Sequence, residues 1–184
     1  MNTTRGAMTF TAAVIAVIIS TSALGAQAIG TWISFRMPEG RYTVLMPGTP
    51  KLSAQEATAA TGEKFPQYIA SAADSESGAA YFVGYFDMTP TQTYTLTDGR
   101  DGMAKAVNGT VIGETKVTLS GYPGLDVTIS LTSAGTDFVA RARFYQVERR
   151  VYIVQGVIPR TGMTASVEKV AKFFDSFQVS KTPY

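Results

Sequence analysis

The sequence predicts an α+β sandwich whose sheet is antiparallel, and segment 137–158 gives the main support for this fold class. From Phe138 to Tyr145 apolar and polar residues alternate, a pattern typical of a strand with two unlike faces. Residues 151–158 are apolar on both faces, which is typical of a strand buried from both sides. Glu148-Arg149 is expected to form the tight turn between these strands. Strands precede the first helix and antiparallel strands precede the last, an order that favours α+β over a doubly wound parallel fold.

Residues 1–28 are predicted to form a secretory signal peptide, and residues 29–184 a single domain. Arg5 precedes a short apolar run, and Ala26-Gln27-Ala28 matches the small-residue pattern of a cleavage site. An uncleaved membrane anchor is the alternative, although the apolar run is shorter than the roughly 20 residues that a span requires. We therefore expect a periplasmic or secreted protein with no integral membrane segment in the mature chain.

Composition excludes several kinds of chemistry. The chain has 16 basic and 14 acidic residues, and loss of Arg5 with the signal peptide lowers the net charge from +2 to +1. This balance argues against nucleic acid as a partner, because binding a duplex requires a clustered basic excess. The chain contains neither histidine nor cysteine. Histidine- or cysteine-dependent catalytic sites and the usual zinc and copper sites are therefore excluded, and no metal or cofactor is predicted.

The first half of the chain is expected to form four strands and one exposed loop. Clusters of proline and glycine after short apolar runs mark the ends of the strands. The loop is expected at 51–62, where residues are small and polar, and Asp74–Gly78 is expected to close a hairpin. The four strands are expected at 31–35, 42–46, 64–72 and 79–86.

Two helices are expected further along the chain. The first begins near Leu96 with Thr97 as its N-cap, ends at Asn108-Gly109, and turns Met103 and Val107 towards the core. The second is expected at 164–176, because apolar residues repeat there at helical spacing. Its expected buried stripe is Val167, Val170, Ala171, Phe174 and Phe177, and its expected solvent side is Ser166, Glu168, Lys169 and Lys172.

Between the helices, strands at 111–119 and 125–131 are expected to continue into the strand after Asp137 as a meander. Pro123-Gly124 is expected to form a type II turn, because proline fixes φ and glycine accepts a positive φ. Matching the apolar faces predicts the register. The expected rungs are Val117 with Val127 and Ala142, and Leu119 with Leu125 and Phe144.

The other face of this meander is expected to carry charges that form a partner-binding patch or a self-neutralising ladder. In the ladder, Asp126 pairs with Arg143 and Glu114 neutralises Lys116, each pair contributing about 0.2–1 kcal/mol. The ladder is favoured, because the acids fall on the same face as the bases. Tyr145 fits either packing or an exposed aromatic anchor. The candidate partner-binding residues are Lys116, Arg141, Arg143, Tyr145, Arg149 and Arg150.

One short motif invites an enzymatic interpretation. Ser166 and Lys169 match the S-x-x-K nucleophile motif of penicillin-recognising enzymes, which also require S-D-N and K-T-G elements. Neither element occurs in this sequence. A serine and a lysine on the polar side of an amphipathic helix explain the match better, so no catalytic residue is predicted.

Several stretches together resemble a known family. They are Phe35–Val44, Met46–Lys51, Gly121–Gly124, the strand of Arg141, Arg143 and Tyr145 with Val151-Tyr152, and Phe173–Phe177. In this order they resemble the PsbP-like superfamily of exported bacterial PsbP/DcrB-like proteins. The resemblance implies an α/β/α sandwich around a central, mostly antiparallel sheet with two main helices. It also implies a class whose known members mostly bind other proteins and assist assemblies. The metal-binding residues proposed for PsbP itself include histidine, so no metal site is carried over.

These observations lead to three functional hypotheses. The first is a non-catalytic exported protein that binds another protein of the cell envelope or assists its assembly. The second is a carrier of a small ligand with an apolar cleft lined by some of the 10 Phe and 9 Tyr residues. An enzyme that uses only carboxylate and lysine chemistry is the third and least favoured.

Overall fold

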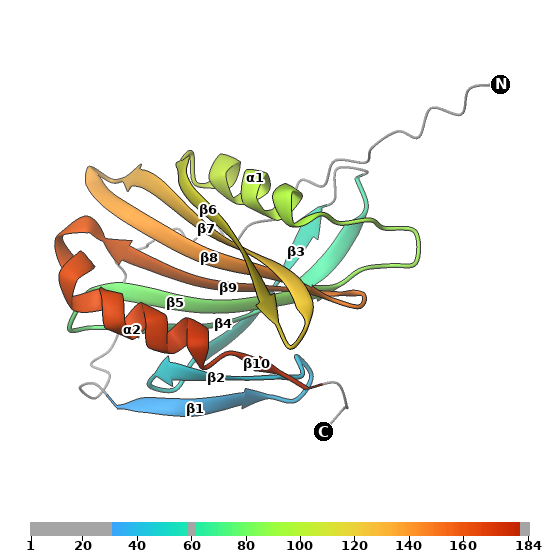
Figure 1. Ribbon diagram of the computed structural model, residues 1–184, viewed down its shortest axis with the longest axis horizontal. Helices are drawn as coiled ribbons and strands as arrows, with labels where there is room; N and C mark the ends of the chain where they lie inside the picture. Colours follow the sequence, from blue (N-terminus) through green and yellow to red (C-terminus); the bar gives the residue numbers. More distant parts are fainter. Residues whose placement is uncertain (1–30, 59–61, 181–184) are drawn as a thin grey trace.

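The computed structural model of the protein describes residues 31–58 and 62–180, which form an α+β sandwich on a seven-stranded antiparallel sheet (Figure 1). The predicted signal peptide lies outside the described residues. The main sheet has the order β3-β4-β5-β9-β8-β7-β6, and a smaller sheet has the order β1-β2-β10. The elements are β1 (Trp32–Met37), β2 (Tyr42–Pro47), β3 (Lys51–Thr58), β4 (Lys64–Asp74), β5 (Ala79–Asp87), α1 (Leu96–Ala106), β6 (Thr110–Leu119), β7 (Tyr122–Ser133), β8 (Thr136–Val147), β9 (Arg150–Pro159), the 3₁₀ turn η1 (Arg160–Gly162), α2 (Met163–Asp175) and β10 (Gln178–Val179).

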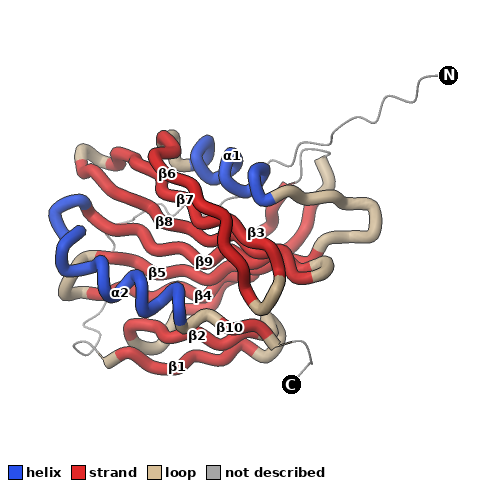
Figure 2. The backbone as a smooth tube through the Cα atoms, in the orientation of Figure 1, coloured by secondary structure: helices blue, strands red, loops and turns tan. Residues whose placement is uncertain are grey.

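Each face of the main sheet carries its own hydrophobic core. The α1-side core includes Met103, Phe144 and Ile153, whereas the α2-side core includes Tyr152 and Phe173. On the second face α2 packs against β9 and β2, so the small sheet and α2 share one layer (Figure 2). The predicted α+β class and the two-helix sandwich are confirmed, and the small sheet is an addition that the sequence did not predict. None of the helices in the described ranges is long and apolar enough to cross a membrane.

The hairpin between β6 and β7 turns at a different place from the one predicted. Ser120 and Gly121 have φ values of 51° and 87°, and two consecutive positive φ values match the twist of a two-residue hairpin. The predicted type II turn at Pro123-Gly124 is therefore wrong, and both residues lie inside β7. By contrast, the predicted turn at Glu148-Arg149 is confirmed, because β8 ends at Val147 and β9 begins at Arg150.

The predicted register of the meander is confirmed between β7 and β8 and is wrong between β6 and β7. Val127 faces Ala142 and Leu125 faces Phe144, as expected. On the other side of β7, however, these two residues face Glu114 and Lys116, whereas Val117 faces Gly124 and Leu119 faces Tyr122. The cause is the turn, which begins three residues earlier than expected. An odd shift moves every side chain to the other face.

A β-bulge in β6 divides that strand between the two cores. The register shifts between Val111 and Gly113, which leaves Ile112 as the extra residue. Val111 consequently packs on the α1-side core, whereas Val117 and Leu119 pack on the α2-side core. The bulge thus explains why one strand with an apparently regular pattern contributes apolar side chains to both hydrophobic cores.

The predicted loop at 51–62 is wrong over most of its length. Lys51–Thr58 forms β3, which pairs with β4 along its whole length at the edge of the main sheet. Ala57 is its single buried residue. A strand that is exposed on both faces needs no apolar alternation, and its small polar residues therefore resemble a loop.

The two helices occur where the sequence predicts them, with corrections to their detail. The N-cap of α1 is Thr95, not Thr97, because the Thr95 hydroxyl accepts from the Asp98 amide while the Asp98 carboxylate accepts from the Thr95 amide. Met103 is fully buried as predicted, and Val107 is the partly buried C-cap.

The buried stripe of α2 is rotated by about one residue from the predicted one. Val167 is 58% exposed and Ala171 is exposed, so their expected burial is wrong. Ser166 is buried instead, and its hydroxyl donates to the Gly162 carbonyl at 2.8 Å, which satisfies the polar group. The observed stripe is Ser166, Val170, Phe173 and Phe174, followed by Phe177 after the helix.

Candidate functional site

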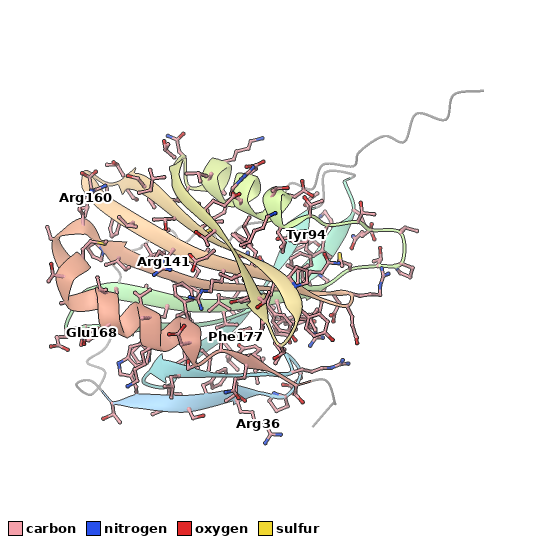
Figure 3. All side chains as sticks on the ribbon, in the orientation of Figure 1. Arg36, Tyr94, Arg141, Arg160, Glu168 and Phe177 are labelled. Atoms are coloured by element: carbon pink, nitrogen blue, oxygen red, sulfur yellow. The ribbon has the colours of Figure 1, made fainter. Side chains whose placement is uncertain are left out.

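The predicted partner-binding residues do not form one patch. Lys116 shares its rung with Leu125, which places it on the α1 side. Arg141 and Arg143 lie on the opposite face, where Figure 3 shows Arg141 close to α2. Arg149 lies in the turn between β8 and β9 and Arg150 begins β9, which is more than one strand away from Lys116.

Arg141 and Arg143 form a shared ion pair beneath α2. Their guanidinium groups donate to one oxygen of Asp126 at 2.8 and 2.9 Å. Both also lie over the Phe174 ring, at 5.3 and 4.8 Å from its centroid, and Arg143 reaches Asp175 at 3.3 Å. The predicted pairing of Asp126 with Arg143 is confirmed, but the side chain of Asp126 is only 10% exposed, so this is not a surface ladder.

The predicted neutralisation of Lys116 by Glu114 is replaced by another contact. Glu114 accepts from Arg100 of α1 at 2.7 Å, and Arg100 also bonds Asp101 at 2.7 Å. Both Glu114 and Lys116 lie on the α1 side, because they share rungs with apolar residues of that core. The shifted turn therefore places Lys116 on the opposite face from the arginines that the sequence grouped with it.

Tyr145 is a packing residue and not an exposed anchor. It is buried, and its ring stacks on Phe177 with centroids 6.1 Å apart and an interplanar angle of 8°. A Cβ at Gly124 on the next strand would lie 2.4 Å from the Tyr145 ring, so the ring requires glycine there. Figure 3 shows Phe177 between the end of α2 and the small sheet.

Tyr145 is one end of a row of tyrosines across the sheet. Tyr68, Tyr85, Tyr152 and Tyr145 stand directly opposite one another on β4, β5, β9 and β8. Tyr152 donates to the Gly40 carbonyl at 2.8 Å, which ties the row to the turn between β1 and β2. Only Tyr68 is substantially exposed, at 39%. The row thus runs from the buried centre of the α2-side core to the surface.

At the exposed end of this row lies a shallow groove of about 330 Å³. Tyr68 stacks on Tyr85 there, with centroids 5.1 Å apart and an interplanar angle of 23°. Arg150 lies 4.7 Å above the Tyr85 ring and pairs with both carboxylate oxygens of Asp87, at 2.7 and 2.6 Å. We call this site the tyrosine groove. Its lining residues are Met37, Glu39, Tyr68, Tyr85, Asp87 and Arg150.

The bonds around Arg150 fix its charge and position. Besides its two bonds to Asp87, it donates to the Glu39 carbonyl at 2.6 Å. The hydrogen bonds to Asp87 raise the pKa of Arg150 above its ordinary value. Burial raises the pKa of Tyr85 to about 12, although Arg150 acts in the opposite direction. At neutral pH the floor of the groove is therefore a fixed guanidinium and a neutral phenol.

An apolar strip continues from the tyrosine groove along the edge of the main sheet. Leu52 is 52% exposed, and it lies on the same face as Ala54, which stands opposite Tyr68. A second shallow groove of about 340 Å³ lies further along the same two strands and includes Ala54 and Pro66. We call Leu52, Ala54, Pro66 and Tyr68 the edge strip.

Sequence reasoning missed both the tyrosine groove and the edge strip. The residues that meet in the groove come from β1, β4, β5 and β9 and the turn after β1, so no local pattern links them. One signal was present: Pro66 and Tyr68 occupy the solvent-facing positions of an alternating strand. Apolar residues on the exposed side of such a strand indicate a contact surface.

The S-x-x-K match is structural. Ser166 is buried and bonded to the Gly162 carbonyl. Lys169 is held by Asp74 and Glu76 at 2.7 and 2.6 Å, which keeps its ammonium group charged. Burial of the hydroxyl and protonation of the amine leave this serine without access to a substrate and without a base.

The layers and strand order define a PsbP-like α/β/α sandwich. The solution structure of cyanobacterial PsbP (CyanoP) from Synechocystis sp. PCC 6803 superimposes with a TM-score of 0.54 at 12% identity, covering 86% of this chain and 98% of that one. The chain therefore shares the PsbP-like fold, as the resemblance of its motifs implied.

Two further solved structures match with lower TM-scores. LpqN of Mycobacterium tuberculosis, which is involved in cell envelope biogenesis, matches with a TM-score of 0.40 at 9% identity, over 73% of this chain and 86% of that one. Protein PA94 of Pseudomonas aeruginosa, a possible regulator of unknown function, matches with a TM-score of 0.45 at 10% identity, over 76% and 91%. No family model and no curated protein matches the sequence.

Proposed function

We propose that the protein is an exported, non-catalytic factor that binds another protein of the cell envelope and assists its assembly. One observation carries the proposal: the edge strip exposes apolar side chains beside a groove with a fixed floor. Leu52 and Tyr68 are the large exposed apolar residues there, at 52% and 39%. Contiguous apolar surface of this kind marks sites of protein–protein contact.

The partner is expected to bind as an extended segment along β3. Within the described residues β3 is hydrogen-bonded on one side only, to β4, so its outer backbone groups can pair with an added strand. The other edge, β6, carries a bulge and the charges of Glu114 and Lys116, which are devices that discourage pairing. The stretch from Leu52 to Gln55 has neither.

The alternative of a small-ligand carrier requires an apolar cleft. In the described residues most large aromatic side chains fill the two cores, and the tyrosine groove is an open depression at the lower end of ligand-pocket volumes. Native mass spectrometry of the purified protein distinguishes the two, because a carrier should copurify with a small molecule.

Site-specific photo-crosslinking in the native host tests the proposal. A photoreactive residue in place of Leu52 should give a discrete crosslinked product, and the same residue in place of Val167 should not. Val167 is the matched control, since it is 58% exposed but lies on α2, away from the edge strip. Equal products at both positions, or none at Leu52, would contradict the proposal.

Export is a separate part of the proposal. We expect cleavage after Ala28, so that mass spectrometry of protein from the native host finds Ile29 as the first residue. A full-length chain retained in the inner membrane would show that the N-terminal segment is an anchor instead.

A further inference from the structure

We infer that the tyrosine groove holds one basic side chain, an arginine or a lysine, that projects from the extended segment of the partner protein. This inference rests on the proposed function, because it concerns the same surface. It specifies the chemistry of the residue that anchors the partner. The argument depends on the charges in the groove, on its aromatic wall and on its shape.

The net charge of the side chains that line the groove is negative. Two carboxylates, Glu39 and Asp87, line it with one guanidinium, Arg150. Arg150 spends three of its five N–H donors on the two Asp87 oxygens and the Glu39 carbonyl, so Asp87 already compensates its charge. The Glu39 carboxylate has no ion pair among the described residues. A cation entering the groove therefore finds an unpaired carboxylate.

The wall of the groove suits a cation on an apolar stem. The Tyr68 ring is 39% exposed and stacked on Tyr85, which holds its plane in a fixed orientation. A guanidinium or ammonium group over such a ring is attracted by its negative face. Met37 lines the same groove and offers an apolar contact for the methylene stem of lysine or arginine.

The same contacts disfavour other side chains. An acidic side chain would meet the Glu39 carboxylate, and Arg150, the basic residue of the groove lining, is already paired with Asp87. A neutral amide would gain neither the charge interaction nor the full attraction of the ring. Arg150, one of the predicted partner-binding residues, thus lines a site for a basic side chain, because Asp87 neutralises it within the fold.

NMR titration of the isotope-labelled protein, purified after export, tests the inference. The probes are four capped heptapeptides of identical sequence except for a central Arg, Lys, Gln or Glu. The Arg and Lys peptides should shift the amide signals of Glu39, Tyr68 and Tyr85 and bind about tenfold more tightly than the Gln peptide. This preference should shrink as salt is raised, because exposed charges are screened. Equal binding of the Arg and Gln peptides, or tighter binding of the Glu peptide, would overturn the inference.

Two variants make the test specific. Glu39→Gln keeps the backbone bond to Arg150 and should abolish most of the preference for Arg and Lys. Glu168→Gln removes an exposed carboxylate from α2 and should leave the preference unchanged. Tyr68→Leu should reduce the affinity for the Arg peptide more than for the Gln peptide, because only the former uses the ring face. If both glutamate variants behave alike, the groove does not select a base.

The outcomes separate this inference from the proposed function. Crosslinking at Leu52 without any preference among the peptides would refute the basic anchor and leave the docking surface in place. A preference for Arg and Lys without crosslinking at Leu52 would support the groove chemistry and refute the edge strip as the partner's path.

Discussion

Replacing both Arg141 and Arg143 with glutamine should destabilise the protein by about 2–4 kcal/mol. Both arginines bond one oxygen of Asp126, whose side chain is only 10% exposed. Breaking a buried pair costs about 3–5 kcal/mol because it leaves a charge without a partner. The side chains of the two arginines are themselves 35% and 20% exposed, so water recovers part of that loss. The fully exposed ladder considered from the sequence would instead keep the change within about 1 kcal/mol.

Urea unfolding followed by far-UV circular dichroism measures this difference. Fluorescence of Trp32, the only tryptophan, gives a second probe because its ring packs edge-on against Tyr81 at 5.3 Å. Adding Asp126→Asn to the double variant should recover most of the loss, since no unpaired charge then remains beneath α2. A double variant within about 1 kcal/mol of the parent, or a triple variant as unstable as the double, would refute the reasoning.

Three further predictions follow from packing and burial. Phe174→Ala should cost about 3–5 kcal/mol in urea unfolding, whereas Val167→Ala should stay within about 0.5 kcal/mol; equal losses would contradict the observed rotation of α2. Gly124→Ala should cost about 1–3 kcal/mol through collision with the Tyr145 ring, whereas Gly113→Ala meets only Thr128 at 3.6 Å and should cost far less. Burial raises the pKa of Tyr81 and of Tyr85 from 10.0 to about 12. The contribution of the two phenols to the free energy of unfolding should therefore be complete below pH 10 and lost between pH 10 and 12. Absorbance at 295 nm follows their ionisation and circular dichroism follows unfolding, and ionisation near pH 10 without unfolding would contradict the prediction.

The sequence predicts best the strands whose two faces differ or are both buried. In β8 the alternation from Phe138 gives the strand and its register with β7, because each apolar residue can only face the core. The same logic fails for β6, because the turn at Ser120-Gly121 shifts its register by three residues and the extra residue Ile112 switches the faces again near its start. It also fails for β3, whose exposed residues need no pattern at all.

The candidate site was less predictable than the fold. Arg143 and Asp126 could be paired from their rung, but their burial depends on which face α2 turns towards the sheet. That face includes Ser166, whose hydroxyl is satisfied by the Gly162 carbonyl, and the sequence pattern does not reveal this. The tyrosine groove depends on Glu39 and Arg150, which are 111 residues apart in the chain and meet only when the small sheet packs on the main one. Such contacts follow from packing and not from any local pattern.

The row of tyrosines has a consequence for how tightly the groove would hold the partner that we propose. Association loses affinity whenever a mobile side chain must be ordered, by about 0.5–1.5 kcal/mol for each one. Tyr85 and Tyr152 are already immobilised by burial, and Tyr145 is clamped against Phe177, so binding has little beyond Tyr68 to order at this wall. Packing in the α2-side core therefore keeps this surface rigid. A substitution at Phe177, which contacts Tyr145 and Tyr152 but does not line the tyrosine groove, should loosen the row and speed the dissociation of a partner from the proposed site.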